Sequence, residues 1–179
     1  MALMNFNLIV STFRYGERDA QEEILDLLEI LGDNQPESQI TDINGIVIAY
    51  TNLEPFQVIN SLRELIKSEP WQIRYVLRLL PIESVVHTRL EDIESAAKNL
   101  TLKMHSEDTF RITVERRHSF MTSADIIATV GRQINNKVDL KNPEWIVIIE
   151  IIGAFNGLSV LKSNQIFSSV IEKRHNSQW

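Results

Sequence analysis

The chain lacks cysteine entirely and has only six glycines and five prolines among 179 residues. Without cysteine it can form no disulfide, no cysteine-ligated zinc or iron–sulfur site and no thiol nucleophile. No stretch reaches the roughly 20 consecutive apolar residues that a membrane-spanning helix needs. No basic segment precedes the first apolar stretch, and Arg14 interrupts that stretch early. We therefore expect a soluble cytoplasmic protein with no membrane association.

Motifs typical of enzymes are also missing. The sequence contains neither a G-x-G-x-x-G nor a G-x-x-x-x-G-K-[ST] phosphate-binding motif, and no acidic pair with catalytic spacing. Its four histidines lie too far apart in sequence for a local metal site: His87, His105, His118 and His175. We therefore expect neither a catalytic site nor a bound metal or cofactor.

Acidic side chains outnumber basic ones, but the two halves of the chain differ. The net charge is −6, with 24 Asp and Glu residues against 18 Lys and Arg. Residues 1–84 carry −7, whereas residues 85–179 carry +1. Between positions 109 and 141 there are six basic residues and three acidic ones. A local basic patch of this kind is enough for salt-dependent contacts with RNA phosphates.

Hydrophobic periodicity predicts a first α+β unit over residues 1–83. Helices are expected at 17–32 and between Pro55 and Pro70, and strands at 5–14, on either side of Asn44-Gly45, and at 71–81. Asn-Gly between two apolar runs is the short-range signal of a β-hairpin. The resulting order, β-α-β-β-α-β, is that of a ferredoxin-like fold. One face of the last strand is expected to comprise Ile73, Tyr75, Leu77 and Leu79.

A second unit is predicted over residues 84–179. Its first helix is expected to begin at Thr88, where the sequence T-R-L-E matches a capping box that Glu91 completes. The run at 146–152 is almost entirely apolar, which predicts a central strand of a sheet. Asn156-Gly157 is expected to form the turn that follows this strand.

Between these elements, T-F-R-I-T-V-E-R-R at 109–117 alternates apolar and polar residues, which predicts a strand. Its last residues, Arg116 and Arg117, are expected to leave the sheet at its edge. An amphipathic helix follows, with Thr122 or Ser123 as its N-cap. In the V-D-L-K-N-P sequence beyond it, the Asp139 side chain is expected to accept backbone N–H bonds. The apolar stripe of the helix is expected to comprise Ile127, Val130, Ile134 and Val138.

These pieces, in this order, resemble the core of the THUMP domain: the strand F-R-I-T-V-E-R-R, the helix carrying Val130-Gly131, and V-D-L-K-N-P-E-W-I-V-I-I-E-I. The resemblance runs from about Ser84 to Arg174 and implies an α/β THUMP domain, which binds RNA and chiefly tRNA, after an N-terminal ferredoxin-like domain. We expect the RNA contacts to come from the basic residues of this segment and from one histidine: Arg111, Arg116, Arg117, His118, Arg132, Lys137 and Lys141.

The chain is also similar, in two further segments, to the stand-alone THUMP adaptor family that assists the acetyltransferase making N4-acetylcytidine in tRNA. These segments are residues 13–33, which begin F-R-Y-G-E-R-D, and residues 73–100, which begin I-R-Y-V-L-R-L-L-P-I. Arg14, Gly16 and Glu17 would match the first loop of that family, although its usual cysteine is absent here. The resemblance implies a non-catalytic adaptor whose partners are tRNA and a separate tRNA-modifying enzyme, an acetyltransferase.

Two other functions are compatible with the sequence. The chain could be the RNA-binding subunit of a split tRNA-modifying enzyme such as a methyltransferase, or a protein-interaction module without RNA binding. In the second case, docking would use the acidic face of the first helix, which a simpler interpretation treats as a solvated surface. That face comprises Glu22, Glu23, Asp26 and Glu29.

Overall fold

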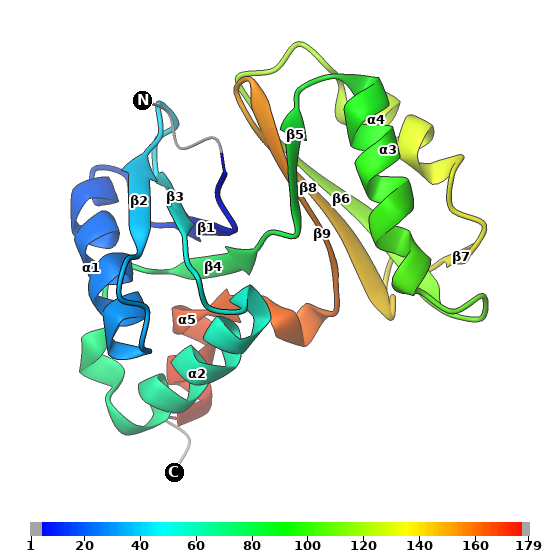
Figure 1. Cartoon of the computed structure of the whole chain (residues 1–179). Helices are drawn as coiled ribbons and strands as arrows, with labels where there is room; N and C mark the ends of the chain where they lie inside the picture. The colour runs from blue at the N-terminus through cyan, green and yellow to red at the C-terminus, as the bar shows by residue number, and fades with distance from the viewer. Residues whose placement is uncertain (1–4, 177–179) are drawn as a thin grey trace. The chain divides into compact units, whose positions relative to one another are not determined.

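The computed structural model describes residues 5–176 and divides the chain into two compact units (Figure 1). The first unit contains the described residues up to Pro81 together with those from Asn164 onward, and the second runs from Ile82 to Ser163. Each unit combines helices with one five-stranded sheet, so the predicted α+β class is confirmed. The expected division after residue 83 assigned all of residues 84–179 to the second unit. In the structure, the segment from Asn164 onward belongs to the first unit instead.

The first unit has the predicted β-α-β-β-α-β order. Its sheet has the strand order β10-β4-β1-β3-β2, and every strand pair is antiparallel. The central strand is β1, and β10 extends the ferredoxin-like arrangement beside β4. The elements are β1 (Leu8–Ser11), α1 (Glu17–Ile30), β2 (Glu37–Ile40), β3 (Ile46–Tyr50), α2 (Pro55–Ser68), the 3-10 helix η1 (Pro70–Gln72), β4 (Arg78–Pro81), β10 (Phe167–Ser168) and α5 (Ser169–Asn176).

Helices α1 and α2 bury apolar faces in one shared core with the sheet. Gly32 follows α1 with a φ of +102°, a left-handed conformation that glycine adopts without a Cβ penalty. Gly45, in the predicted hairpin between β2 and β3, has a φ of +76° for the same reason. The buried helical side chains are Ala20, Ile24, Leu27 and Leu28 of α1, and Val58, Ile59, Leu62 and Ile66 of α2.

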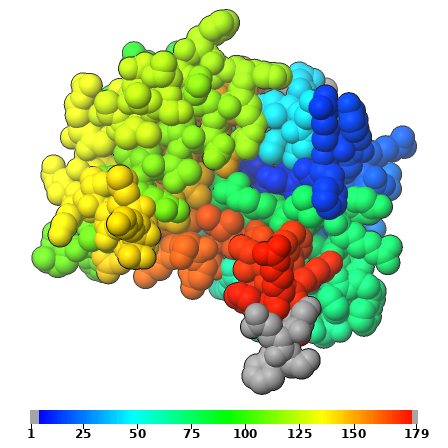
Figure 2. Space-filling view, turned by 180° about the vertical axis from the view of Figure 1, so that it is seen from behind, coloured from blue at the N-terminus to red at the C-terminus, as the bar shows by residue number. Residues whose placement is uncertain are grey.

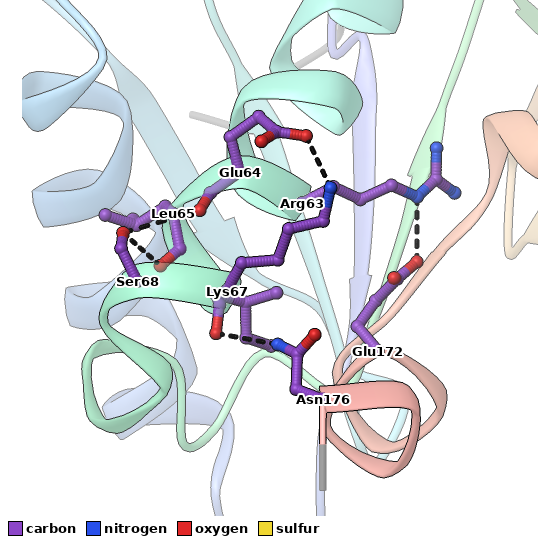
Figure 3. A network of polar contacts seen from close by, with 8 residues as sticks. Arg63, Glu64, Leu65, Lys67, Ser68, Glu172 and Asn176 are labelled. Carbon is purple, nitrogen blue, oxygen red and sulfur yellow. Dashed lines mark hydrogen bonds and ion pairs between the residues drawn. The ribbon is translucent and has the colours of Figure 1, made fainter. Parts of the chain in front are cut away.

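Polar contacts hold the C-terminal helix α5 against α2 (Figure 3). Arg63 donates from Nε to Glu172 Oε1 at 2.7 Å and from Nη2 to the Ile166 carbonyl at 2.8 Å. Asn176 Nδ2 donates to the Ile66 carbonyl at 3.2 Å. In Figure 2, α5 is the red segment at the surface of the first unit. Its eight mostly polar residues carry no periodic signal, so the sequence did not predict it.

The predicted strand at 71–81 is much shorter than expected. Only Arg78–Pro81 pairs as β4, Pro70–Gln72 forms η1, and residues 73–77 have no regular structure. The predicted alternation is therefore wrong. Instead, the residues of this segment that join the core with α1 and α2 are spaced by three: Ile73, Val76 and Leu79.

Glu23 of α1 explains why this segment is not a strand. Its carboxylate accepts backbone N–H bonds from Arg74 at 2.7 Å, Tyr75 at 2.9 Å and Val76 at 2.7 Å. A strand would direct alternate N–H groups to a neighbouring strand. Here three consecutive N–H groups turn toward one side chain, which bends the backbone out of the sheet.

The second unit is a sheet of order β5-β9-β8-β6-β7 whose one face is covered by α3 and α4 (Figure 1). Strand β6 is parallel to β7 and β8, and the other pairs are antiparallel. The apolar strand β8 lies between β6 and β9, so its predicted central position is confirmed. The elements are β5 (Ser84–His87), α3 (Leu90–Leu100), η2 (Thr101–Lys103), β6 (Thr109–Arg117), α4 (Ser123–Gly131), β7 (Lys137–Val138), β8 (Trp145–Ile152) and β9 (Phe155–Leu161), with η3 (Ser163–Gln165) at the junction.

The start of this unit differs from the prediction. Strand β5 was not expected, and α3 begins at Leu90 with Arg89 as an N-cap that makes no side-chain capping bond. The Thr88 hydroxyl instead donates to the Gly153 carbonyl at 2.8 Å. The predicted capping box is therefore wrong, because Thr88 ties the end of β5 to the β8–β9 turn.

The turn between β8 and β9 also lies at other residues than predicted. It falls at Gly153 and Ala154, and Gly153 has a φ of +61°. Asn156 and Gly157, the predicted turn residues, lie inside β9 and pair with β8. The Asn156 side chain donates to the His87 carbonyl at 2.9 Å, a contact that links β9 to β5.

Candidate RNA-binding surface

Strand β6 distributes the predicted contact residues over two faces of the sheet. Phe110 is buried and Ile112 packs against the core under α3 and α4, as their alternation predicted. Because successive strand residues point to opposite faces, Arg116 shares this helix-covered face. Arg111 and Arg117 lie on the opposite face. The two adjacent arginines therefore have different surroundings.

The register of β6 with β8 keeps both arginines in the sheet. Arg116 pairs with Ile151, and Arg117 pairs with Ile152 at the end of the strand. The prediction that they leave the sheet is therefore wrong. On its other side, β6 pairs with β7 only at its first two residues, so its C-terminal half forms an edge.

The guanidinium group of Arg117 makes an ion pair with Glu150 of β8. Arg117 Nη1 lies 2.6 Å from Glu150 Oε2, and the side chain of Glu150 is fully buried while that of Arg117 is 24% exposed. A buried carboxylate needs a partner of opposite charge, because its removal from water is costly. The first role of Arg117 is therefore structural.

Arg116 instead supports the loop of residues 118–122 that joins β6 to α4. Its Nη1 donates to the Met121 carbonyl at 2.9 Å and lies 3.5 Å from the Ser119 carbonyl. The Ser119 hydroxyl accepts the N–H of Met121 at 3.2 Å. His118 is exposed and has a φ of +53°, which is uncommon for a residue with a Cβ atom. These contacts tie the loop to the end of β6.

The loop presents Phe120, whose side chain is 108% exposed. No other large apolar side chain in the described part of the chain is as exposed. Such a ring is free to stack on an unpaired base. Phe120 is not among the predicted contact residues, although the sequence R-R-H-S-F places it within four residues of two arginines.

Helix α4 follows the loop and returns along β6. Thr122 is its N-cap, as predicted, and the hydroxyl accepts the N–H of Asp125 at 3.1 Å. The helix ends at Gly131, and the exposed Arg132 is its C-cap. Figure 2 shows this segment, in yellow-green to yellow, at the surface of the second unit.

The apolar stripe of α4 is only partly as predicted. Ile126, Val130 and Ile134 are buried, whereas Ile127 is 41% exposed. Val138 lies outside the helix, in β7, and is 55% exposed. The predicted stripe is wrong at these two positions, because the helix is too short to reach Val138 and turns its neighbour Ile126 toward the sheet.

The V-D-L-K-N-P turn is built on Asp139, as predicted. Its Oδ1 accepts the backbone N–H groups of Lys141 and Asn142, each at 2.9 Å. The N–H groups of Asn142 and then Lys141 stabilise the carboxylate and hold the pKa of Asp139 below its ordinary value. A charged carboxylate therefore fixes this turn at neutral pH.

Lys137, Lys141 and Arg111 lie in this turn or beside it, at the start of β6. Arg132 follows Gly131, which lies close to Ile112 in the first half of β6. Lys137 lies in β7 opposite the first residue of β6, and Arg111 Nη1 lies 3.4 Å from the carbonyl of Leu140 in the turn. Since a strand rises about 3.3 Å per residue, the two ends of β6 are roughly 25 Å apart. The predicted contacts therefore form two groups, the loop group of Arg116, Arg117 and His118 and the turn group of Arg111, Arg132, Lys137 and Lys141.

The two groups offer positive charge, and Phe120 beside the loop group offers an exposed ring. Proteins hold RNA phosphates and unstacked bases by such side chains. Within residues 5–176, no cluster of three or more His, Cys, Asp or Glu residues is arranged to hold a metal ion. Among the helices of the same residues, none is long and apolar enough to cross a membrane.

Sequence comparison relates the chain to one family. Residues 87–161 match the family model described as the THUMP domain. The mouse protein named THUMP domain-containing protein 1 is 33% identical over 134 residues, which covers 69% of this chain and 38% of the mouse protein. The human protein of the same name is 30% identical over 136 residues, with the same coverage. The chain thus spans about two fifths of the length of these relatives.

Solved structures share the fold over most of the chain. PH1313 from Pyrococcus horikoshii matches with a TM-score of 0.70 and 22% identity, over 88% of this chain and 55% of that protein. A 4-thiouridine synthetase in complex with RNA and ATP matches with a TM-score of 0.56 and 15% identity, over 92% of this chain and 42% of the synthetase. At these identities the likeness is one of fold.

Proposed function

Because the chain contains a THUMP domain, we propose that it is a non-catalytic tRNA-binding adaptor that presents tRNA to a separate acetyltransferase for N4-acetylcytidine formation. The tRNA ligand is supported by the domain itself and by the groups at the two ends of β6. The acetyltransferase is supported by the similarity of residues 13–33 and 73–100 to the stand-alone adaptor family. The observation that carries the proposal is the loop at 118–122, which is hydrogen-bonded to Arg116 and presents Phe120 beside basic residues.

In this proposal the loop group and the adjacent Phe120 bind an unstacked base and its neighbouring phosphates. Phe120 stacks on the base, and His118 and the exposed part of Arg116 contact phosphate. Because Arg116 already fixes the loop carbonyls, little ordering is needed when RNA binds, and a preorganised surface loses less entropy. Arg117 contributes indirectly by neutralising Glu150.

The turn group contacts the RNA backbone at a distance from this base. Arg132, Lys137 and Lys141 are exposed, and such side chains neutralise phosphates without reading sequence. The separation of roughly 25 Å between the groups means that they engage different nucleotides. The loop group therefore positions a single-stranded base, and the turn group contributes affinity.

Titration of the purified protein with total tRNA, and with tRNA trimmed of its 3′ end, at two salt concentrations tests RNA binding. We expect tight, salt-sensitive binding that is lost on trimming. Phe120→Ala should weaken binding about 5- to 100-fold, the equivalent of one base–aromatic stack. Its dependence on salt should be unchanged, because no charge is removed.

A matched control is Leu102→Ala, which removes another apolar side chain, 79% exposed, from a part of the second unit outside both groups. It should leave tRNA affinity unchanged. Equal losses in the two variants, or none in Phe120→Ala, would exclude the loop as a base-stacking site. Replacing Lys137 and Lys141 together by alanine should instead reduce the slope of log affinity against log salt concentration by about one to two.

Nucleoside analysis of tRNA from a strain without this protein identifies the partner enzyme. Loss of N4-acetylcytidine would support the acetyltransferase. Loss of a methylated nucleoside would assign the chain to a split methyltransferase. An unchanged set of modified nucleosides would argue against both, whatever the affinity for tRNA.

A further inference from the structure

The first unit contains a groove that the proposed RNA site does not use. It lies between α1 and the segment at 71–75, which includes the end of η1, and has a volume of about 420 Å³. Figure 1 shows this segment, in green after α2, beside α1. One wall is acidic and the other is aromatic. The lining residues that matter are Asp19, Glu22, Asp26 and Ile30 of α1, and Trp71 and Tyr75 of the segment.

Large apolar side chains are exposed along this groove. Trp71 is 60% exposed, Ile30 56% and Tyr75 37%. Single exposed apolar residues are common, but several that line one groove mark an interaction site. Tryptophan and tyrosine also supply much of the binding energy at protein interfaces. The groove therefore has the composition of a site that another molecule covers.

Hydrogen bonds fix the aromatic wall in place. The carboxylate of Glu23 accepts the N–H groups of Arg74, Tyr75 and Val76 at 2.7 to 2.9 Å. Arg74 Nε donates to the Trp71 carbonyl at 2.9 Å. The segment is thereby tied to α1, and the groove exists before any partner arrives. A preformed site keeps the entropy cost of binding low.

The acidic wall determines the chemistry of the partner. Asp19, Glu22 and Asp26 are exposed and follow one another at helical spacing, while Arg74 is the one basic residue among the groove's lining residues. Arg18 lies 3.7 Å from Glu22, but both are largely exposed, so this pair neutralises little. Such a wall repels the phosphates of RNA and attracts basic side chains.

We propose that this groove binds an extended basic segment of a partner protein. Neighbouring carboxylates on a helix face lie about 5–6 Å apart, close to the roughly 6.7 Å between alternate residues of an extended chain. Alternate side chains point to opposite sides. Basic ones would meet α1, and apolar ones between them would meet Trp71 and Tyr75. This inference does not depend on RNA binding.

A fluorescent seven-residue peptide of alternating arginine and leucine is the probe, and the same peptide with glutamate in place of arginine is its control. With the full chain at low salt, only the arginine peptide should bind. Asp26→Lys should weaken binding about tenfold through like-charge repulsion. Trp71→Ala should weaken it about two- to fivefold, because the leucine side chains then lose the apolar surface of the indole ring.

Glu29→Lys is the matched control, because it makes the same charge change on α1 at an exposed residue outside the groove lining. It should leave peptide affinity nearly unchanged. Equal weakening by Asp26→Lys and Glu29→Lys would mean general attraction to an acidic unit and would overturn the proposal, as would absence of binding at low salt. Affinity for tRNA should stay constant in all three variants. A loss of tRNA affinity would mean that the groove contacts RNA instead. Thermal unfolding of each variant confirms that it folds.

Discussion

Arg116 and Arg117 are neighbours in sequence with different roles, because consecutive strand residues face opposite ways. Arg116 reaches the carbonyls of the 118–122 loop, and Arg117 reaches the buried Glu150. From the sequence of this segment alone, the two arginines are equal candidates for RNA contacts. Their separation depends on the register, which places Glu115 opposite Glu150 and so puts Glu150 on the face of Arg117.

Replacing these two arginines one at a time should separate their roles. Arg117→Ala removes the ion pair that Arg117 makes with the buried Glu150 and should destabilise the protein by about 2–4 kcal/mol. Adding Glu150→Gln should recover part of this loss, because the buried charge is then gone. Arg116→Ala should cost about 1 kcal/mol or less, as expected for exposed hydrogen bonds.

Urea unfolding of the four proteins measures these differences. Equal destabilisation by the two single substitutions would contradict the assignment. So would a double variant that is less stable than Arg117→Ala alone.

At the scale of secondary structure elements, long periodic patterns were predictable and short pairings were not. The helices α1 and α2, the central position of β8, and the Asn44-Gly45 hairpin follow from local patterns. Strands β5, β7 and β10 have four, two and two residues, too few for a periodic signal. They form because distant strands offer hydrogen-bonding edges, which no local pattern encodes.

The same contrast applies to the candidate site. Its basic residues could be identified from composition, and its N-cap at Thr122 from the helix signal. The split into loop and turn groups depends on how α4 returns along β6. The exposure of Phe120 depends on a loop that Arg116 and Ser119 hold. Both features depend on tertiary structure, which local sequence patterns do not encode.

The end of α1 is connected to the end of β3 through Asp33, which is buried. Its carboxylate accepts hydrogen bonds from the Thr51 hydroxyl at 2.6 Å, the Asn52 N–H at 2.9 Å and the Gln35 N–H at 3.1 Å. Burial alone would raise the pKa of Asp33, but these hydrogen bonds outweigh it and the pKa is lowered.

Stability should therefore depend on pH through Asp33. Because the pKa is lower in the folded state, the carboxylate stabilises the fold above its ordinary pKa of about 4, and this contribution is lost as pH falls through the folded pKa. Asp33→Asn should reduce stability at pH 7 and flatten its decline in acid, as measured by urea midpoints between pH 7 and 3. Asp42→Asn, at an exposed site, is the control. A parallel decline in wild type and Asp33→Asn would refute the role.

At the scale of the whole molecule, the first unit is assembled from two separate stretches of chain. Phe167 of β10 is fully buried in the core that α1 and α2 cover. The Ser169 N–H donates to the Leu77 carbonyl at 3.0 Å, and Lys173 Nζ donates to the Ile73 carbonyl at 2.5 Å. Both contacts attach the C-terminal segment to the irregular segment before β4.

Phe167→Ala tests this assembly. The substitution leaves a cavity in the core and should destabilise the first unit by about 3–5 kcal/mol. Hydrogen exchange should then accelerate in α1, α2 and β4. Val170→Ala, three residues on and 44% exposed, should change little. Unchanged exchange in the Phe167 variant would mean that the C-terminal segment does not contribute to the core.

The discontinuity of the first unit has a consequence for protein synthesis. A ribosome completes residues 82–163 before it makes β10, so the outer edge of β4 has no partner during that interval. An unpaired edge strand is a template for pairing with other chains, and nascent domains aggregate through such edges. A gene fragment cut after Pro81 would make that transient state permanent. Expression of the first unit alone therefore calls for both stretches, joined by a short linker in place of the second unit.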